Sequence, residues 1–247
     1  MNTLILNPNT SLRISQILHD EARCYVTDSR CLKVANVTGG VEYISTPLES
    51  IVATNYMLQY IADNHERFDC IIVGAFGDPG VQQIRRYLEI PIIGLTGSSL
   101  AHAKMLRDRV SLISLTSAFR EWYSDVISSL GYNSLVSQYL SAEVDMEIAV
   151  NRDRIKLARA AVDIILSNVP RQNAVVLAGA PWAGIANMIA GQIPNPVFDG
   201  VESSLLFCNA LYSSRNKVEP NKKVVQGVKN VSGLLPAVAN FINAAKW

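Results

Sequence analysis

Short runs of Val, Ile and Leu alternate with longer segments of helical periodicity along almost the whole chain of 247 residues. Runs such as 70–74 and 174–178 show no polar alternation, as expected of strands that are buried on both faces. Strands that alternate with helices are typical of a parallel sheet with crossover helices. The sequence therefore predicts the α/β class.

The boundaries of the expected elements follow from the apolar periods and from the Gly, Pro and Asn residues between them. Strands are predicted at 3–6, 31–37, 70–74, 92–95, 110–114, 174–178 and 197–199. Helices are predicted at 11–25, 48–64, 81–88, 98–106, 117–130, 152–168, 185–191, 202–212 and 234–245.

Two blocks of the first half recur in the second half in the same order. Residues 71–81 lie over 175–185, so that an apolar strand, small residues, a turn and a Gly coincide, and 91–100 lie over 196–205. Any two strand-turn-helix units share such features, but the paired order of the blocks argues against chance. The repeat predicts two pseudo-symmetric lobes with parallel sheets flanked by helices and a ligand cleft between them, because ligands bind outside the carboxyl ends of such strands.

The repeat also predicts how the chain is divided between the lobes. Residues 1–100 together with 215–247 are expected to form the first lobe, and 101–214 the second. The polar, basic stretch 214–229 is expected to be a linker that returns the last helix to the first lobe.

Two loops that follow strands offer polar groups at the expected cleft. Asn7, Asn9, Thr10 and Ser11 stand between a strand and a helix, and Thr116-Ser117 repeat this arrangement. Such residues cap helices, whose free N–H groups attract small anions, so that the two loops together suit a carboxylate. The alternative is a pair of helix caps without a ligand.

Two further loops, 74–80 and 178–184, are dense in small residues that allow close approach of the backbone to a ligand. Phe76 and Trp182 either line the cleft or pack in the core, and Asp78 either faces the cleft or caps a helix that begins at Pro79. The residues that read the ligand's tail are expected to include Trp182, Tyr43 and Thr96. Contacts with a ligand are predicted for Asn7, Asn9, Thr10, Ala75, Phe76, Gly77, Thr116, Ser117, Gly179, Ala180, Pro181 and Trp182.

Charge and hydropathy exclude several classes of partner. The net charge of +1 and a charged fraction of 17% argue against nucleic-acid binding and against a polybasic membrane anchor. No apolar run approaches the roughly 18 residues that span a bilayer, and no signal-peptide pattern follows Met1, which predicts a cytoplasmic location.

Cysteine and histidine usage gives no metal or nucleophile signature. His19, His65 and His102 stand singly, and Cys24, Cys31, Cys70 and Cys208 have no metal-ligand spacing, so no metal is expected and the cysteines are expected to be reduced. The chain has no GxSxG, Walker or GxGxxG motif.

The blocks 4–10, 74–80, 91–94, 178–184 and 198–201 resemble the hydantoin and allantoin racemase branch of the aspartate/glutamate racemase superfamily. The most specific are Asn7-Pro-Asn-Thr10 and Phe76-Gly-Asp-Pro-Gly80. The resemblance implies two pseudo-symmetric α/β lobes, an active site between them, no cofactor and a homo-oligomer. It also implies a pair of cysteines, one from each lobe, that transfer protons on opposite faces of the substrate carbon.

The positions that match these two cysteines hold Ala75 and Gly179, neither of which carries a transferable proton. Three explanations are open: an engineered change of Cys to Ala, a different chemistry in the same cleft with Asp78, Asp199, Tyr43 or a water as the proton carrier, or a ligand-binding protein without catalysis. The expected function is an isomerase-like or lyase-like enzyme that acts on a small carboxylate, an amino-acid derivative or a cyclic ureide. The alternative is a non-catalytic small-molecule binding or regulatory protein.

Overall fold

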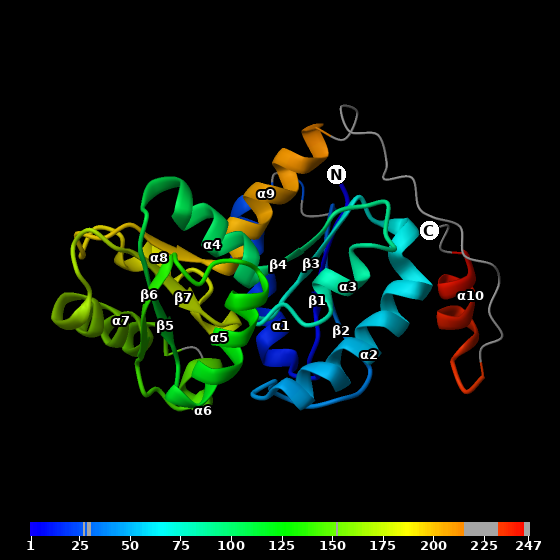
Figure 1. Cartoon of the computed structure of the whole chain (residues 1–247), viewed down its shortest axis with the longest axis horizontal. Coiled ribbons are helices and arrows are strands. Elements are labelled where there is room, and N and C mark those ends of the chain that lie inside the picture. The colour runs from blue at the N-terminus through cyan, green and yellow to red at the C-terminus, as the bar shows by residue number, and fades with distance from the viewer. Residues whose placement is uncertain (27, 29–30, 152, 215–231, 245–247) are drawn as a thin grey trace.

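The structure, a computed structural model, describes residues 1–26, 28, 31–151, 153–214 and 232–244. Its strands form two four-stranded parallel sheets with the orders β2-β1-β3-β4 and β6-β5-β7-β8 (Figure 1). The first sheet holds β1 (Thr3–Asn7), β2 (Leu32–Asn36), β3 (Cys70–Val73) and β4 (Ile92–Gly94), and the second holds β5 (Val110–Ser114), β6 (Val136–Ser141), β7 (Ala174–Ala178) and β8 (Val197–Asp199). The order is the same in both sheets, which confirms the α/β class and the two pseudo-symmetric lobes.

Helices surround both sheets (Figure 1). They are α1 (Leu12–Ala22), α2 (Pro47–Asn64), α3 (Val81–Ile84), α4 (Leu95–Leu106), α5 (Arg120–Ser129), α6 (Met146–Val150), α7 (Arg154–Asn168), α8 (Ile185–Ile189), α9 (Gly200–Ser214) and α10 (Pro236–Ala244), with short 3₁₀ turns η1 (Arg23–Tyr25), η3 (His65–Arg67), η4 (Ser117–Phe119) and η5 (Ala180–Trp182). Local signals start several of them. For example, Thr46 and Glu49 form a capping box at the start of α2, with Pro47 in its first turn.

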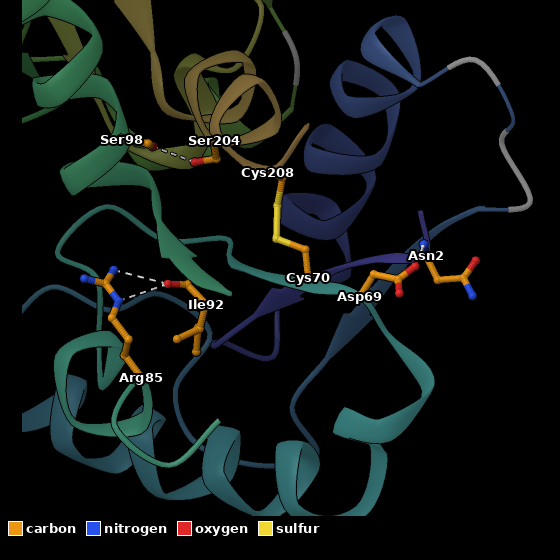
Figure 2. Close-up of a disulfide and its surroundings, with 8 residues drawn as sticks. All are labelled: Asn2, Asp69, Cys70, Arg85, Ile92, Ser98, Ser204 and Cys208. Atoms are coloured by element: carbon orange, nitrogen blue, oxygen red, sulfur yellow. Dashed lines mark hydrogen bonds between the residues drawn. A yellow bond between two sulfur atoms is a disulfide. The ribbon is translucent and has the colours of Figure 1, made fainter. Parts of the chain in front are cut away.

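Two helices cross from one sheet to the other. Helix α4 leaves β4 of the first sheet and packs on β7 and β8, whereas α9 leaves β8 of the second sheet and packs on β3 and β4. The two helices also pack against each other, and the hydroxyls of Ser98 and Ser204 lie 2.6 Å apart between them (Figure 2). The exchange joins the two lobes, and the division of the chain at residues 100 and 214 stays a prediction.

A disulfide connects the first sheet to α9. Figure 2 shows the side chain of Cys208 reaching from α9 to Cys70 at the start of β3, with a sequence separation of 138 residues. The expectation that all four cysteines are reduced is therefore wrong for this pair, while Cys24 and Cys31 are free. The pair is invisible to spacing rules because the crossing of α9, which is a tertiary feature, brings the two residues together.

Other departures from the predicted elements are local. Strand β6 was not expected, because its residues Val136–Ser141 mix polar and apolar types, as suits a half-buried strand at the edge of a sheet. Helix α6 was also not expected, and α3 is shorter than predicted. Most of the linker predicted at 214–229 lies outside the described residues, and beyond it α10 packs on α2, where Phe241 meets the rings of His65 and Tyr87. Among the residues that the structure describes, no helix combines the length and apolarity needed to cross a membrane.

Candidate functional site

A cavity lies between the two lobes, at the carboxyl ends of the strands. It encloses about 440 Å³ of space between protein atoms, part of which is open to solvent. The loops after β1 and β3 form one side, and those after β5 and β7 form the other. We call it the interlobe cavity, and its lining residues are Asn9, Ile14, Tyr43, Ile44, Gly74, Ala75, Phe76, Leu115, Phe119, Tyr123, Met146, Ala178, Gly179, Ala180 and Pro181.

The walls of the interlobe cavity are mostly apolar, and none of its lining residues is charged. One buried polar group in this lining is the amide of Asn9, which is 6% exposed. Its Oδ1 accepts a hydrogen bond from the Ser11 N–H at 3.0 Å, and within the described chain its Nδ2 has no partner. This amide nitrogen is therefore available to donate to a ligand.

Two phenols complete the polar lining, one from each lobe. Tyr43 comes from the loop between β2 and α2, and loss of hydration raises the pKa of its hydroxyl. Tyr123 comes from α5 and is 4% exposed, and burial raises its pKa well above the usual range. Both groups stay protonated at neutral pH, so they can donate a hydrogen bond or a proton but are poor bases.

Tyr123 is held in place by aromatic neighbours. Its ring meets Phe76 of the first lobe edge-on, with centroids 4.8 Å apart, and stacks on Phe119 at 5.4 Å. No hydrogen-bond partner of its hydroxyl is found among residues 1–26, 28, 31–151, 153–214 and 232–244. Sequence reasoning missed this residue because it stands in the middle of a predicted helix, where nothing in the apolar period separates it from a core aromatic.

The structure brings about half of the predicted site residues to the interlobe cavity. Asn9, Tyr43, Ala75, Phe76, Gly179, Ala180 and Pro181 line it. Asn7, Thr10, Gly77, Asp78, Thr96, Thr116, Ser117, Trp182 and Asp199 are not among its lining residues.

Several of the residues away from the cavity are occupied with internal bonds. The side chain of Asn7 donates to the Ser11 carbonyl and to Ser15 Oγ, and Thr10 Oγ1 donates to the Val41 carbonyl. Trp182 is fully buried. These residues shape the loops rather than the surface of the cavity.

Gly77, which follows the lining residue Phe76, forms a hydrogen bond with Thr96. The N–H of Gly77 donates to Thr96 Oγ1 at 2.7 Å, in a fully buried position for Thr96. Gly77 has a φ of +99°, and a Cβ there would stand 2.3 Å from the Trp122 ring. Both the backbone conformation and the ring therefore require glycine.

Asp78 and Asp199 are buried and bind backbone N–H groups. Asp78 accepts hydrogen bonds from the N–H groups of Thr96 and Gly97 at 2.7 and 2.8 Å, so it caps α4. The alternative from the sequence, that Asp78 caps a helix beginning at Pro79, is therefore wrong. Asp199 accepts from Gly184, Val201 and Glu202 at 3.0, 3.0 and 3.2 Å.

Burial is the main cause of the unusually high pKa values of these two carboxyls. It raises the pKa of each to about 6, although the backbone N–H groups oppose the shift. Neither residue lines the interlobe cavity, and both hold the loops that form it.

No cysteine lines the interlobe cavity. Cys24 is exposed in η1 and Cys31 is half-buried before β2, while Cys70 starts β3 and so lies at the opposite end of that strand from Ala75. Ala75 and Gly179 follow the equivalent strands β3 and β7 and border the cavity from the two lobes. Gly179 has a φ of +132°, which L side chains rarely adopt.

Ser117 lies at a second, smaller cavity on the second lobe, next to Arg120. Its N–H donates to the carboxylate of Glu143 at 3.2 Å. Within the described chain, no group of three or more His, Cys, Asp and Glu side chains is arranged to hold a metal ion.

Comparison with known proteins shows which family this chain matches. Residues 4–206 match the family described as Asp/Glu/Hydantoin racemase. A hydantoin racemase from Pseudomonas sp. (strain NS671) is 23% identical over 230 residues, which cover 90% of this chain and 90% of that protein.

Solved structures share the fold. An allantoin racemase from Klebsiella pneumoniae superposes with a TM-score of 0.82 at 19% identity, covering 96% of this chain and 98% of that one. A mutant of arylmalonate decarboxylase superposes with a TM-score of 0.64 at 13% identity, covering 85% of this chain and 91% of that one.

Proposed function

Because the chain belongs to the Asp/Glu/hydantoin racemase family, we propose that it is an isomerase-like or lyase-like enzyme that works without a pair of cysteines. Its substrate is a small carboxylate, an amino-acid derivative or a cyclic ureide, bound in the interlobe cavity without a cofactor. The observation that carries this proposal is the lining of that cavity, where Ala75 and Gly179 stand at equivalent places and no cysteine is present.

The available proton donors favour a reaction that needs only one proton delivery. Racemisation requires a group on each face of the carbon, because a single base that returns its own proton retains configuration. Ala75 and Gly179 supply neither group, and the phenols of Tyr43 and Tyr123 are not available as bases, because their raised pKa values keep them protonated at neutral pH. A phenol can, however, protonate a carbanion that forms when another bond breaks.

Decarboxylation is one such reaction. The C–C bond to the carboxylate breaks, CO₂ leaves with neither electron of that bond, and the carbanion takes the phenol proton. Water then reprotonates the phenolate. The presence of a decarboxylase among proteins of this fold supports lyase chemistry as an option for this cavity.

Proton NMR in deuterated water tests the proposal. The protein is incubated with hydantoins, allantoin, free amino acids, small dicarboxylates and malonates. We expect loss of a Cα proton signal or growth of a product signal for at least one class. Tyr123→Phe should slow that reaction about 100-fold or more if Tyr123 delivers the proton, while Tyr212→Phe, near the C-terminal end of α9 and outside the cavity lining, serves as a matched control.

The absence of charged side chains from the interlobe cavity favours a second candidate, a non-catalytic small-molecule binding or regulatory protein. The same experiment separates the two. Line broadening of a panel member without proton exchange or conversion would indicate binding alone, and would refute the proposal that the protein is an enzyme. The homo-oligomer and the cytoplasmic location also stay proposals, to be tested by light scattering and by cell fractionation.

A further inference from the structure

A second cavity opens beside the interlobe cavity, at the carboxyl ends of β5 and β6 and against α5. It encloses about 300 Å³ of space between protein atoms, open solvent included, and we call it the Arg120 cavity. Its lining residues are Leu112, Ser114, Ser117, Arg120, Tyr123, Tyr139, Leu140 and Ser141. Polar residue types thus make up a larger share of its lining residues than of those of the interlobe cavity.

Arg120 is the one charged residue among the lining residues of the two cavities. Its guanidinium carbon lies 5.7 Å from the centroid of the Tyr139 ring, which orients the group by a cation–π contact. Arg120 is exposed, and within the part of the chain that the structure describes its guanidinium has no carboxylate partner and donates no hydrogen bond. Its five N–H donors therefore face solvent or a ligand, and their fork geometry matches a carboxylate.

A carboxylate of the protein already binds at the rim of this cavity. Glu143 accepts hydrogen bonds from the Ser117 N–H and the Ser141 hydroxyl, two residues of the cavity lining. The Ser141 bond is the main cause of the lowered pKa of Glu143. Glu143 itself is exposed, so its side chain can turn toward solvent when another carboxylate takes these donors.

Tyr123 is shared by the two cavities, since it is a lining residue of both. A ligand whose reacting end lies between Ala75 and Gly179 has only to extend past this ring to reach Arg120. Tyr123 is 4% exposed, and its phenol has no hydrogen-bond partner in the described chain.

We propose that the Arg120 cavity is a subsite for a second, distal carboxylate of the ligand, bound by Arg120, and that Glu143 competes with this carboxylate for Ser117 and Ser141. The inference rests on the proposed function, which places the reacting end of the ligand in the interlobe cavity. It narrows the substrate class to compounds that carry an anionic tail.

Matched ligand pairs test the subsite by titration calorimetry. Hydantoin-5-acetate is compared with hydantoin-5-acetamide, and succinate with succinamate, because each pair differs only in the charge of one end. The wild-type protein should bind the carboxylate member more tightly. Arg120→Gln should weaken that member about tenfold to 100-fold and leave the amide member within about twofold, as expected for loss of a charge-assisted bond.

Two further variants sharpen the test. Glu143→Gln should tighten binding of the carboxylate member about twofold to fivefold, because a neutral amide competes less well for the same donors. Arg109→Gln removes the same charge from the amino end of β5, the opposite end from Arg120, and should change no affinity by more than about twofold.

Equal weakening by Arg120→Gln and Arg109→Gln would overturn the subsite, as would equal affinity for carboxylate and amide or no binding of either pair. The proposed function fails separately. Carboxylate binding that depends on Arg120, without any proton exchange or conversion, would support the subsite and refute the proposed enzymatic function. Turnover of an uncharged hydantoin that Arg120→Gln leaves unchanged would support the enzymatic function and refute the subsite.

Discussion

The two lobes of this protein reach the same backbone arrangement with different side chains. Strands β1, β2, β3 and β4 have the same neighbours as β5, β6, β7 and β8. The turn after each central strand ends in a left-handed glycine, Gly80 with φ +69° and Gly184 with φ +78°. Side chains placed around this shared frame differ, which shows that the frame and not a particular residue is what the repeat preserves.

A buried carboxylate illustrates the difference. In the first lobe Asp78 comes from the loop after β3 and reaches the N–H groups of α4. In the second lobe Asp199 comes from the end of β8, binds the N–H groups of α9 and reaches back to Gly184. Each lobe thus joins its two loops through one carboxylate. The carboxylate follows β3 in the first lobe, whereas in the second lobe it ends β8.

The residue opposite each carboxylate follows from this exchange. The position in the first lobe that matches Asp199 is Gly94, where a Cβ would stand 2.1 Å from the carboxyl carbon of Asp78. The position in the second lobe that matches Asp78 is Trp182, which fills the core instead. Only one of the two positions can supply the carboxylate, because the space holds one.

The disulfide marks a second difference. Cys70 opens β3 and Cys208 lies on α9, which covers β3. The matching residues of the other lobe are Ala174, which opens β7, and Ala103 on α4, which covers β7. Both alanines are fully buried. The same contact between helix and strand is therefore covalent in one lobe and apolar in the other.

The largest expected effect is loss of this bond. Cys70→Ala with Cys208→Ala makes the first lobe resemble the second and should lower the free energy of unfolding by about 2 to 5 kcal/mol, because the bond closes a long loop. Urea denaturation followed by circular dichroism measures it. Dithiothreitol should reproduce the effect on the wild type, and Cys24→Ala should have none. An unchanged midpoint in both experiments would contradict a bond in solution.

Exchange of the carboxylate between strands is the next test. Asp78→Ala should lower the free energy of unfolding by about 2 to 4 kcal/mol, because the buried N–H groups of Thr96 and Gly97 lose their acceptor. Gly94→Asp alone should also destabilise, because two carboxylates then share one space. The double variant should regain at least half of the summed loss. Simple additivity of the two changes would refute the equivalence of the lobes here.

A second disulfide should be compatible with the other lobe. Ala103→Cys with Ala174→Cys places thiols at the matching contact of α4 and β7, and a bond there should raise the free energy of unfolding by about 1 to 3 kcal/mol. Thiol titration after mild oxidation and urea denaturation check it. Two persistent free thiols would show that the repeat does not extend to this contact.

The smallest expected effect concerns pH. The carboxyls of Asp78 and Asp199 have pKa values of about 6 when folded and about 3.9 when unfolded. The folded state therefore holds more protons between pH 4 and pH 6, and the stability that each group contributes is lost as the pH rises through this window. Asp199→Asn removes one such group.

Midpoints of urea denaturation between pH 4 and pH 7 provide the measurement for Asp199. As the pH rises, the stability of the wild type should fall relative to that of Asp199→Asn. A constant difference between the two proteins would show that Asp199 does not titrate in this range. The corresponding change Asp78→Asn should behave alike if the two carboxylates are equivalent.

How much of the candidate site the sequence predicted depended on the kind of residue. Asn9, Ala75 and Gly179 were located because each stands directly after a strand, where a parallel sheet presents its loops. Tyr123 was missed, since it reaches the cavity from inside a helix. Asn7 and Thr10 belong to the predicted segment at the end of β1, but their side chains form hydrogen bonds with neighbouring groups of the protein. Sequence spacing alone does not reveal these bonds.

The sequence by itself determined the α/β class, the repeat of two lobes and the loops that meet between them, because apolar period and turn residues act locally along the chain. Only the tertiary structure decided that α4 and α9 each pack on the sheet of the other lobe and that Cys70 bonds to Cys208. It also decided that the buried carboxylate comes from Asp78 after β3 in one lobe and from Asp199 at the end of β8 in the other. These features depend on contacts between residues far apart in the chain. Packing and burial select such contacts after the local elements have formed.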